Sequence, residues 1–148
     1  MDYKLTTYSE EETIELAQNI ESEKFPNMII CLDGELGSGK TVFVKGFANS
    51  MGIDENITSP TFNILKCYNG EKYDFYHIDA YRLADNDVDI GLDEYIGYET
   101  GITVIEWPQF IEKLLPEELI KISIFNVNEN ERNIIIETNL DINLEEIK

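Results

Sequence analysis

The chain has 148 residues, of which 11 are Lys or Arg and 30 are Asp or Glu. A chain of this length can bury a core without disulfides or structural metal ions, so we expect one domain over residues 1–148. The formal net charge of −19 argues against binding of DNA, RNA or an anionic membrane by this chain alone, because such binding draws its affinity from Lys and Arg.

The first half of the chain predicts a helix, a buried strand and a second helix. Ser9 and Glu12 have the spacing of a capping box, and apolar residues then recur at helical spacing to about residue 22. The uninterrupted apolar run 28–32 favours a strand that is buried on both faces. A tight turn is expected at residues 34–39, and helical spacing then continues until Gly52, a residue type that often ends helices.

The middle of the chain predicts a β-hairpin. The runs 62–68 and 72–79 are rich in Phe, Tyr and Ile and flank Asn69-Gly70, a strong hairpin signal. Residues 85–100 are polar with scattered apolar positions, and we expect a short helix and loops there.

The last third predicts three strands and one helix. Residues 102–106 indicate a second buried strand, and a helix is expected from Pro108 to Pro116. Residues 119–126 and 132–138 predict two further strands, followed by a short acidic tail. The expected fold class is α/β, a mixed sheet with parallel core strands and antiparallel hairpins, flanked by helices.

The apolar stretches and the cysteines bear on the compartment. The longest apolar runs are about five residues, far below the roughly 20 that span a bilayer, and the N-terminus lacks the apolar region of a signal peptide. We therefore expect a cytoplasmic protein with no membrane contact. In that reducing compartment, Cys31 and Cys67 are expected to be buried thiols.

A phosphate-binding motif lies between the first predicted buried strand and the following helix. Gly34-Glu35-Leu36-Gly37-Ser38-Gly39-Lys40-Thr41 fits G-x-x-x-x-G-K-[ST], and Val42 continues the helix. Backbone N–H groups would surround the phosphates, Lys40 would reach the β and γ phosphates, and the Thr41 hydroxyl would bind Mg²⁺. The alternative is a Gly-rich turn that only begins a helix. The strand and helix on either side favour a P-loop NTPase-like domain.

A nucleotide tail with three or four negative charges is an unusual ligand for so acidic a chain. Lys40, Lys45, Mg²⁺ and the helix dipole must supply the local attraction. The Debye length is about 8 Å at physiological ionic strength, so the remote carboxylates are largely screened from the site.

Two carboxylates are candidates for holding Mg²⁺ and polarising an attacking water. Glu106 stands at the end of a predicted buried strand, where P-loop proteins place such a group. Asp79 ends the second strand of the predicted hairpin. The alternatives are a solvent-exposed Glu that ends a strand and a turn-forming Asp before Ala80. With a P-loop upstream, we interpret both as site residues.

A hydroxyl-rich segment follows the P-loop helix. Thr58, Ser59 and Thr61 surround a rigid proline, and such a loop could sense the γ-phosphate as switch segments do. On spacing alone, a polar loop that begins a strand is the better interpretation.

Three other patterns are set aside. Asp85, Asp87 and Asp89 imitate the start of an EF-hand loop, but its required sixth-position glycine is Ile90 here. His77 is the only histidine, which excludes a multi-histidine metal site. The aromatic cluster of Tyr68, Tyr73, Phe75, Tyr76 and Tyr81 lacks the basic groove of a base-stacking surface, so we expect it to pack in the core and sheet.

Four segments together resemble the TsaE (formerly YjeE) family, the small bacterial ATPases of the tRNA threonylcarbamoyladenosine system. They are the P-loop, Thr58-Ser59-Pro60-Thr61-Phe62, His77-Ile78-Asp79-Ala80-Tyr81-Arg82-Leu83, and Ile105-Glu106-Trp107-Pro108, in the family's order. The resemblance implies a single α/β domain with a P-loop and a mixed sheet. It also implies that the protein acts with TsaD and TsaB, which install the threonylcarbamoyl group on N6 of adenosine 37 of certain tRNAs.

The resemblance also implies roles for individual residues. Lys40 and Thr41 would hold phosphates and Mg²⁺, and Asp79 and Glu106 would serve the metal and the water. Thr58, Ser59 and Thr61 would form the switch-like loop, and Trp107 is matched as a positional residue. The ligands implied are ATP and Mg²⁺. Direct tRNA binding would be left to the partners, and nucleotide state would control assembly and turnover of the complex.

Two other functions stay open on the sequence. One is a small P-loop kinase of a nucleotide or metabolite, although such kinases use several arginines and only Arg82 and Arg132 exist here. The other is a binding module in which nucleotide is bound but not hydrolysed. Arg132 lies near the predicted C-terminal hairpin, so a transition-state cation is expected to be Arg82 or to come from a partner. Slow intrinsic ATP turnover follows.

Overall fold

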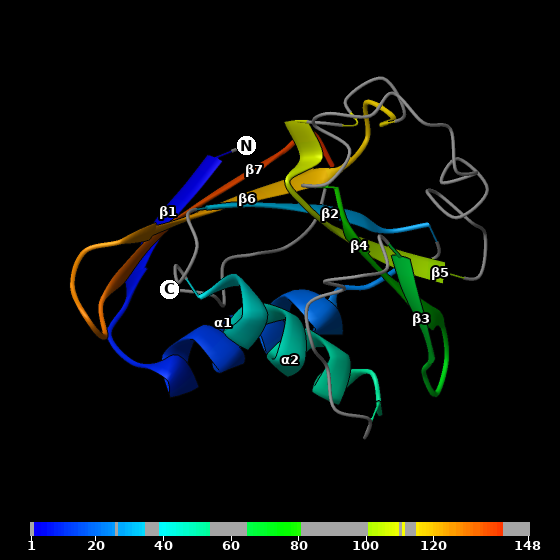
Figure 1. The fold of residues 1–148 in the computed structure, drawn as a ribbon, viewed down its shortest axis with the longest axis horizontal. Coiled ribbons are helices and arrows are strands. Elements are labelled where there is room, and N and C mark those ends of the chain that lie inside the picture. The colour runs from blue at the N-terminus through cyan, green and yellow to red at the C-terminus, as the bar shows by residue number, and fades with distance from the viewer. Residues whose placement is uncertain are drawn as a thin grey trace.

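The protein is described by a computed structural model that covers residues 2–25, 27–34, 39–53, 65–80, 101–109, 111 and 115–140. These residues contain seven strands and two helices (Figure 1). In chain order the elements are β1 (Asp2–Thr7), α1 (Glu10–Ser22), β2 (Ile29–Gly34), α2 (Lys40–Ser50), β3 (Leu65–Asn69), β4 (Asp74–Asp79), β5 (Gly101–Glu106), β6 (Ile120–Asn126) and β7 (Arg132–Thr138).

All seven strands belong to one mixed sheet with the order β1-β7-β6-β2-β5-β4-β3. The central strand β2 pairs in parallel with β5 and β6, and β5 pairs in parallel with β4. The outer pairs, β3 with β4, β6 with β7 and β1 with β7, are antiparallel. The predicted α/β class, with parallel core strands and antiparallel hairpins, is therefore confirmed.

The N-terminal helix begins with the predicted capping box. The Ser9 hydroxyl accepts a hydrogen bond from the backbone N–H of Glu12 at 3.2 Å, and the Glu12 carboxylate accepts one from the N–H of Tyr8 at 3.0 Å. These bonds satisfy N–H groups that have no partner inside the helix. The expected apolar face of α1, which includes Leu16, Ala17 and Ile20, is buried.

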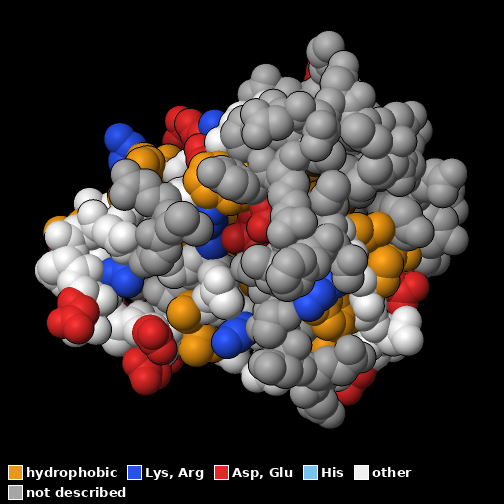
Figure 2. Space-filling model, viewed as in Figure 1, with side chains coloured by type: hydrophobic (Ala, Val, Ile, Leu, Met, Phe, Trp, Pro, Cys, Tyr) orange, Lys and Arg blue, Asp and Glu red, His pale blue; other side chains and the backbone are white. Residues whose placement is uncertain are grey.

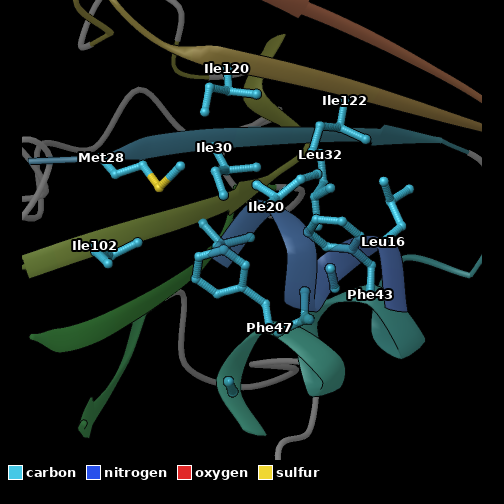
Figure 3. Packing of buried hydrophobic residues seen from close by; sticks show 14 of the residues in the cluster. Leu16, Ile20, Met28, Ile30, Leu32, Phe43, Phe47, Ile102, Ile120 and Ile122 are labelled. Carbon is cyan, nitrogen blue, oxygen red and sulfur yellow. The ribbon is translucent and has the colours of Figure 1, made fainter. Parts of the chain in front are cut away.

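Helices α1 and α2 lie together against one face of the sheet (Figure 1). Figure 3 shows side chains of β2, β5 and β6 pointing toward those of the two helices. Ile30, Leu32, Phe43 and Phe47 are fully excluded from solvent in this layer. A smaller cluster, which includes Ile29, Cys31 and Ile105, covers the other face of the sheet. Both faces of β2 are thus buried, which explains why its sequence shows no polar alternation.

Three predictions of local structure require correction. Strand β1 was not expected, and it forms because Lys4 and Leu5 pair with Ile135 and Ile134 of β7, far away in the sequence. In the β3–β4 hairpin, Asn69 pairs with Asp74, so the connection comprises residues 70–73 and not Asn69-Gly70 alone.

The third correction concerns the cysteines. Cys31 is buried as expected, but Cys67 is exposed, because it lies on a solvent-facing position of strand β3, which is at the edge of the sheet. Tyr68, Phe75 and Tyr76 are buried as predicted, whereas Tyr81 lies outside the described residues.

Several predictions fall outside the part of the chain that the structure describes. They are the N-terminal part of the first hairpin strand at 62–64, the helix and loops at 85–100 with the Asp85–Asp89 pattern, and the acidic tail at 141–148. Residues 110 and 112–114 of the helix expected from Pro108 to Pro116 lie there too. Of its described residues, Pro108, Gln109 and Ile111 adopt a 3₁₀ turn, and residues 115 and 116 are not helical. Neither of the two described helices is long and apolar enough to cross a membrane.

Candidate functional site

The carboxyl ends of the parallel strands β2, β4 and β5 meet at one edge of the sheet. Side chains alternate along a strand, so those two residues apart share a face. On β5, Ile102 and Val104 pack in the helix layer, which puts Glu106 on the helix side as well. On β4, Phe75 packs in the same layer, which puts His77 and Asp79 on that side. Open α/β sheets bind ligands at this edge.

The N-terminus of α2 lies at the same edge. Gly39 precedes the helix with a φ of 106°, a left-handed conformation that favours glycine. Lys40 is the first helical residue and is buried, whereas Thr41 is exposed and Val42 is half-buried. Strand β2 ends at Gly34 and helix α2 begins at Lys40, so a strand and a helix flank the motif as a P-loop requires. Glu35, Leu36, Gly37 and Ser38 lie outside the described residues.

Glu106 lies between two basic side chains. Its Oε1 is 4.0 Å from Nζ of Lys40, and its Oε2 is 2.6 Å from Nε2 of His77. The three side chains are at most 6% exposed. Charges in so buried a setting interact more strongly than at the surface, because little water screens them.

Lys40 is also in contact with an aromatic ring. Its Nζ lies 4.1 Å from the centroid of the Trp107 ring, a cation–π distance. Trp107 has a φ of 58°, which is uncommon for a residue other than glycine and bends the chain directly after Glu106. This bend at the end of β5 lets the carboxylate and the indole approach the same ammonium group.

The pKa of Lys40 lies below its ordinary value. Burial is the main cause, because it disfavours the charged ammonium. The carboxylates of Glu106, Asp79 and Asp33 act in the opposite direction and favour the charged form. The Lys40 ammonium therefore lies near three carboxylates and is poorly hydrated. An anion that binds it displaces little water from the ammonium group.

Asp79 is adjacent to Glu106 across the β4–β5 pair. The two residues are register partners at the ends of neighbouring parallel strands, on the same face. The backbone N–H of Ala80 also donates to the carbonyl of Glu106 at 3.0 Å, which joins the two strand ends. The two candidate residues are therefore neighbours across the β4–β5 pair.

Arg132 lies beside the N-terminus of α2, although it is far from the P-loop in sequence. A Cβ built on Gly39 would lie 3.5 Å from Nε of Arg132. The guanidinium Nη1 donates to the carbonyls of Asn128 at 2.7 Å and Glu131 at 3.1 Å. Strand β6 runs parallel to β2 and therefore ends on the side of the sheet where the P-loop motif lies. Strand β7 begins on that side, and Arg132 is its first residue. The distance of Arg132 from the P-loop motif in sequence gave no indication of this position.

The remaining predicted residues lie outside the described part of the chain. They are Thr58, Ser59, Thr61 and Arg82. On the described surface in Figure 2, Lys and Arg side chains lie among the acidic ones, so this face is not uniformly negative despite the net charge.

The donor set fits a magnesium–nucleotide complex. Mg²⁺ is usually held by one or two carboxylates and hydroxyls together with phosphate oxygens, rather than by a complete protein cage. Thr41, Asp79 and Glu106 offer such oxygens around Lys40. Among the described residues, no group of three Asp, Glu, His or Cys side chains could hold a metal ion by itself.

Comparison with known proteins identifies the family. A family model described as "Threonylcarbamoyl adenosine biosynthesis protein TsaE" matches residues 7–134. The chain belongs to the TsaE family. It is 41% identical over 131 residues to the Bacillus subtilis tRNA threonylcarbamoyladenosine biosynthesis protein TsaE, covering 88% of this chain and 82% of that protein. The Treponema pallidum TsaE is 44% identical over 110 residues, which are 73% of this chain and 80% of that protein.

A solved structure supports the same assignment. The crystal structure of Bacillus subtilis YdiB superposes with a TM-score of 0.79 at 34% identity, covering 93% of this chain and 86% of that chain. The predicted TsaE resemblance and the P-loop α/β fold are therefore confirmed.

Two residues lie at the candidate site although the sequence analysis did not place them there: His77 beside Glu106 and Arg132 beside Gly39. His77 was weighed as a metal ligand and named in a family-like segment but given no role, although its position two residues before Asp79 on a strand puts both on one face. Arg132 carried no local signal, because its proximity to Gly39 depends on the order of strands β6 and β7 in the sheet.

Proposed function

We propose that this TsaE chain is the ATP-binding and ATP-hydrolysing subunit of tRNA threonylcarbamoyladenosine (t6A37) biosynthesis, acting with TsaD and TsaB. Its relatives carry the name of that pathway. The observation that carries the nucleotide part is the convergence of Lys40, at the start of α2, with Glu106, at the end of β5. Binding modules without hydrolysis have no need of a buried carboxylate beside the phosphate-binding lysine.

The residues divide the work as follows. Backbone N–H groups at the start of α2 and the Lys40 ammonium bind the phosphates, and Arg132 adds a second positive charge beside Gly39. Thr41 and Asp79 hold Mg²⁺, which supplies charge neutralisation at the β and γ phosphates when it is bound. Glu106 orients the attacking water and accepts its proton. Trp107 holds the Lys40 ammonium at the strand edge.

The charge of the chain fits a regulatory subunit. A net charge of −19 disfavours tRNA binding, so tRNA is left to the partners. Nucleotide binding and hydrolysis then switch the complex between two states, because a ligand shifts an equilibrium by its difference in affinity for the two. Hydrolysis by the isolated chain is slow, below about 1 s⁻¹, an order of magnitude under the median enzyme.

The test measures phosphate release by the chain alone and with TsaD and TsaB, together with repeated rounds of tRNA modification. We expect slow release alone, faster release with the partners, and loss of both activities in Lys40→Ala. Lys72→Ala is the matched control, because it removes one positive charge from the β3–β4 connection. That connection precedes the amino end of β4, whereas the proposed site lies at the carboxyl end. A Lys40→Ala protein that supports repeated modification would reject the role of nucleotide. Phosphate transfer to a small acceptor faster than to water would indicate a kinase.

A further inference from the structure

The side chain of His77 is enclosed behind the proposed site. It lies on the central part of β4 and is 2% exposed. Its ring is stacked near Phe75, with 6.2 Å between the ring centroids and 17° between the planes. Because the imidazole is buried and bonded to Glu106, we expect it to act on the site through its neighbours.

The hydrogen bond to Glu106 determines which ring nitrogen carries the proton. Nε2 is 2.6 Å from Oε2 of Glu106, a carboxylate oxygen that can only accept when ionised. Nδ1 is buried and has no hydrogen-bond partner among the described residues. A proton on Nε2 makes the bond to Glu106 and leaves only a lone pair at Nδ1. A proton on Nδ1 would instead leave a buried N–H unpaired and set the Nε2 lone pair against the carboxylate.

The same bond fixes the orientation of the Glu106 carboxylate. The terminal torsion of Glu is broad, so a carboxylate held at one point can rotate. Here Oε2 is bound by His77 while Oε1 faces Lys40 at 4.0 Å. The two oxygens thus have distinct partners, and only Oε1 is directed to the side where the P-loop lysine lies.

We propose that His77 is a positioning residue that holds Glu106 by Oε2, so that Oε1 is presented to the attacking water. This inference rests on the proposed function, since it assigns His77 a task in the same hydrolysis. The alternative is a histidine that only fills space between Phe75 and the sheet. In the positioning role, a substitution of His77 lowers the rate of hydrolysis only while Glu106 is present. In the space-filling role, the loss does not depend on Glu106.

One experiment reads the hydrogen bond without any activity. His77 is the only histidine, so ¹⁵N-labelled wild-type protein gives a single imidazole spin system. We expect a proton on Nε2 that exchanges slowly with solvent. A ring protonated at Nδ1 alone would overturn the proposal, whatever the protein hydrolyses.

The second experiment is a double-mutant cycle on hydrolysis with Glu106→Gln. Loss of a hydrogen-bonding group behind a catalytic ligand typically costs about 10–100-fold. We expect His77→Leu to lower kcat by about tenfold or more while the affinity for Mg-nucleotide changes less than about threefold. His77→Gln, whose amide can still donate, should restore most of the rate. In the Glu106→Gln background, His77→Leu should have less than about a twofold further effect.

The matched control is Phe75→Leu, which alters packing on the same face of β4 and is expected to lower the melting temperature without lowering kcat. Equal losses from His77→Leu with and without Glu106, or a loss that follows the melting temperature alone, would reject the positioning role. Unchanged hydrolysis in His77→Leu rejects only the role of His77. Absence of hydrolysis in wild type, with and without partners, rejects the proposed function, and the role of His77 falls with it.

Discussion

The ammonium of Lys40 lies over the ring of Trp107, with 4.1 Å between Nζ and the ring centroid. Trp107 is the only tryptophan of the chain, so the tryptophan emission of the protein comes from this site. When phosphates attract Lys40, the cation moves relative to the indole and the emission should change.

This relationship gives a binding assay. Titration of wild type with Mg-nucleotide is expected to change Trp107 emission in a saturable way. In Lys40→Ala, which lacks the cation that gives the emission signal, the affinity is measured by calorimetry and should fall by about tenfold to a hundredfold, because a charge-assisted hydrogen bond is lost. Lys72→Ala should bind as wild type does. Equal affinities for wild type and Lys40→Ala would remove Lys40 from the phosphate site.

Arg132 provides the second prediction. Its guanidinium is held by the carbonyls of Asn128 and Glu131 next to Gly39, so it should attract phosphate from the β6–β7 hairpin. We expect Arg132→Ala to weaken Mg-nucleotide binding by about tenfold and Arg132→Lys to weaken it less, since Lys keeps the charge but not the planar fork. Lys121→Ala is the control for net charge, because that residue is exposed on β6. The Trp107 titration measures all three, and equal effects of the two alanine variants would contradict a local role.

The elements that could be predicted from sequence are those with a local signal. The capping box at Ser9, the apolar run of β2 and the P-loop pattern are each contained in a few neighbouring residues, and the structure places a helix start, a buried strand and a second helix start there. That Asp79 and Glu106 each end a strand was also predicted from sequence, whereas the parallel pairing that makes them neighbours was not.

The features that the sequence analysis missed depend on pairing between strands that are far apart in the sequence. Strand β1 is short and partly polar, and only its pairing with β7 at the other end of the chain makes it a strand. The contact of Arg132 with the P-loop edge depends on the position of β6 next to β2, which no local pattern encodes. The bond between His77 and Glu106 depends on which of the sheet's strands are neighbours, and it was not anticipated.

The crossing of the two helices gives a prediction on stability. A Cβ on Gly46 would lie 3.1 Å from Cα of Ile14 and 3.3 Å from Cβ of Ala17, so a side chain here would press against α1. Gly46→Val should lower the free energy of unfolding by about 1–3 kcal/mol through overpacking. Asn49→Val, an exposed position on the same helix, should change it far less. Urea unfolding of both variants checks this, and a Gly46→Val protein as stable as wild type would show that the helices can separate at little cost.

The buried thiol of Cys31 makes the free energy of unfolding depend on pH in the alkaline range. Burial raises the pKa of its thiol from 9.0 to about 12, while the positive charge of Lys121 lowers it slightly. Between these values the unfolded chain has lost the thiol proton and the folded chain has kept it, so the free energy of unfolding falls as pH rises, by at most about 1.4 kcal/mol per pH unit. The lowered pKa of Lys40 acts with the opposite sign just below 10.5, because there the unfolded chain binds the additional proton.

A pair of variants isolates the contribution of Cys31. The reference is Cys67→Ser, which removes the exposed thiol and prevents disulfide formation at high pH. The second protein carries Cys31→Val in addition, and both are unfolded in urea from about pH 8 to about pH 11. The reference should lose stability with pH more steeply than the double variant, since tyrosines and lysines contribute equally to both. Parallel curves would mean that the Cys31 thiol ionises in the folded protein as readily as in the unfolded chain, and that β2 is less well sealed from water on that face than its burial indicates.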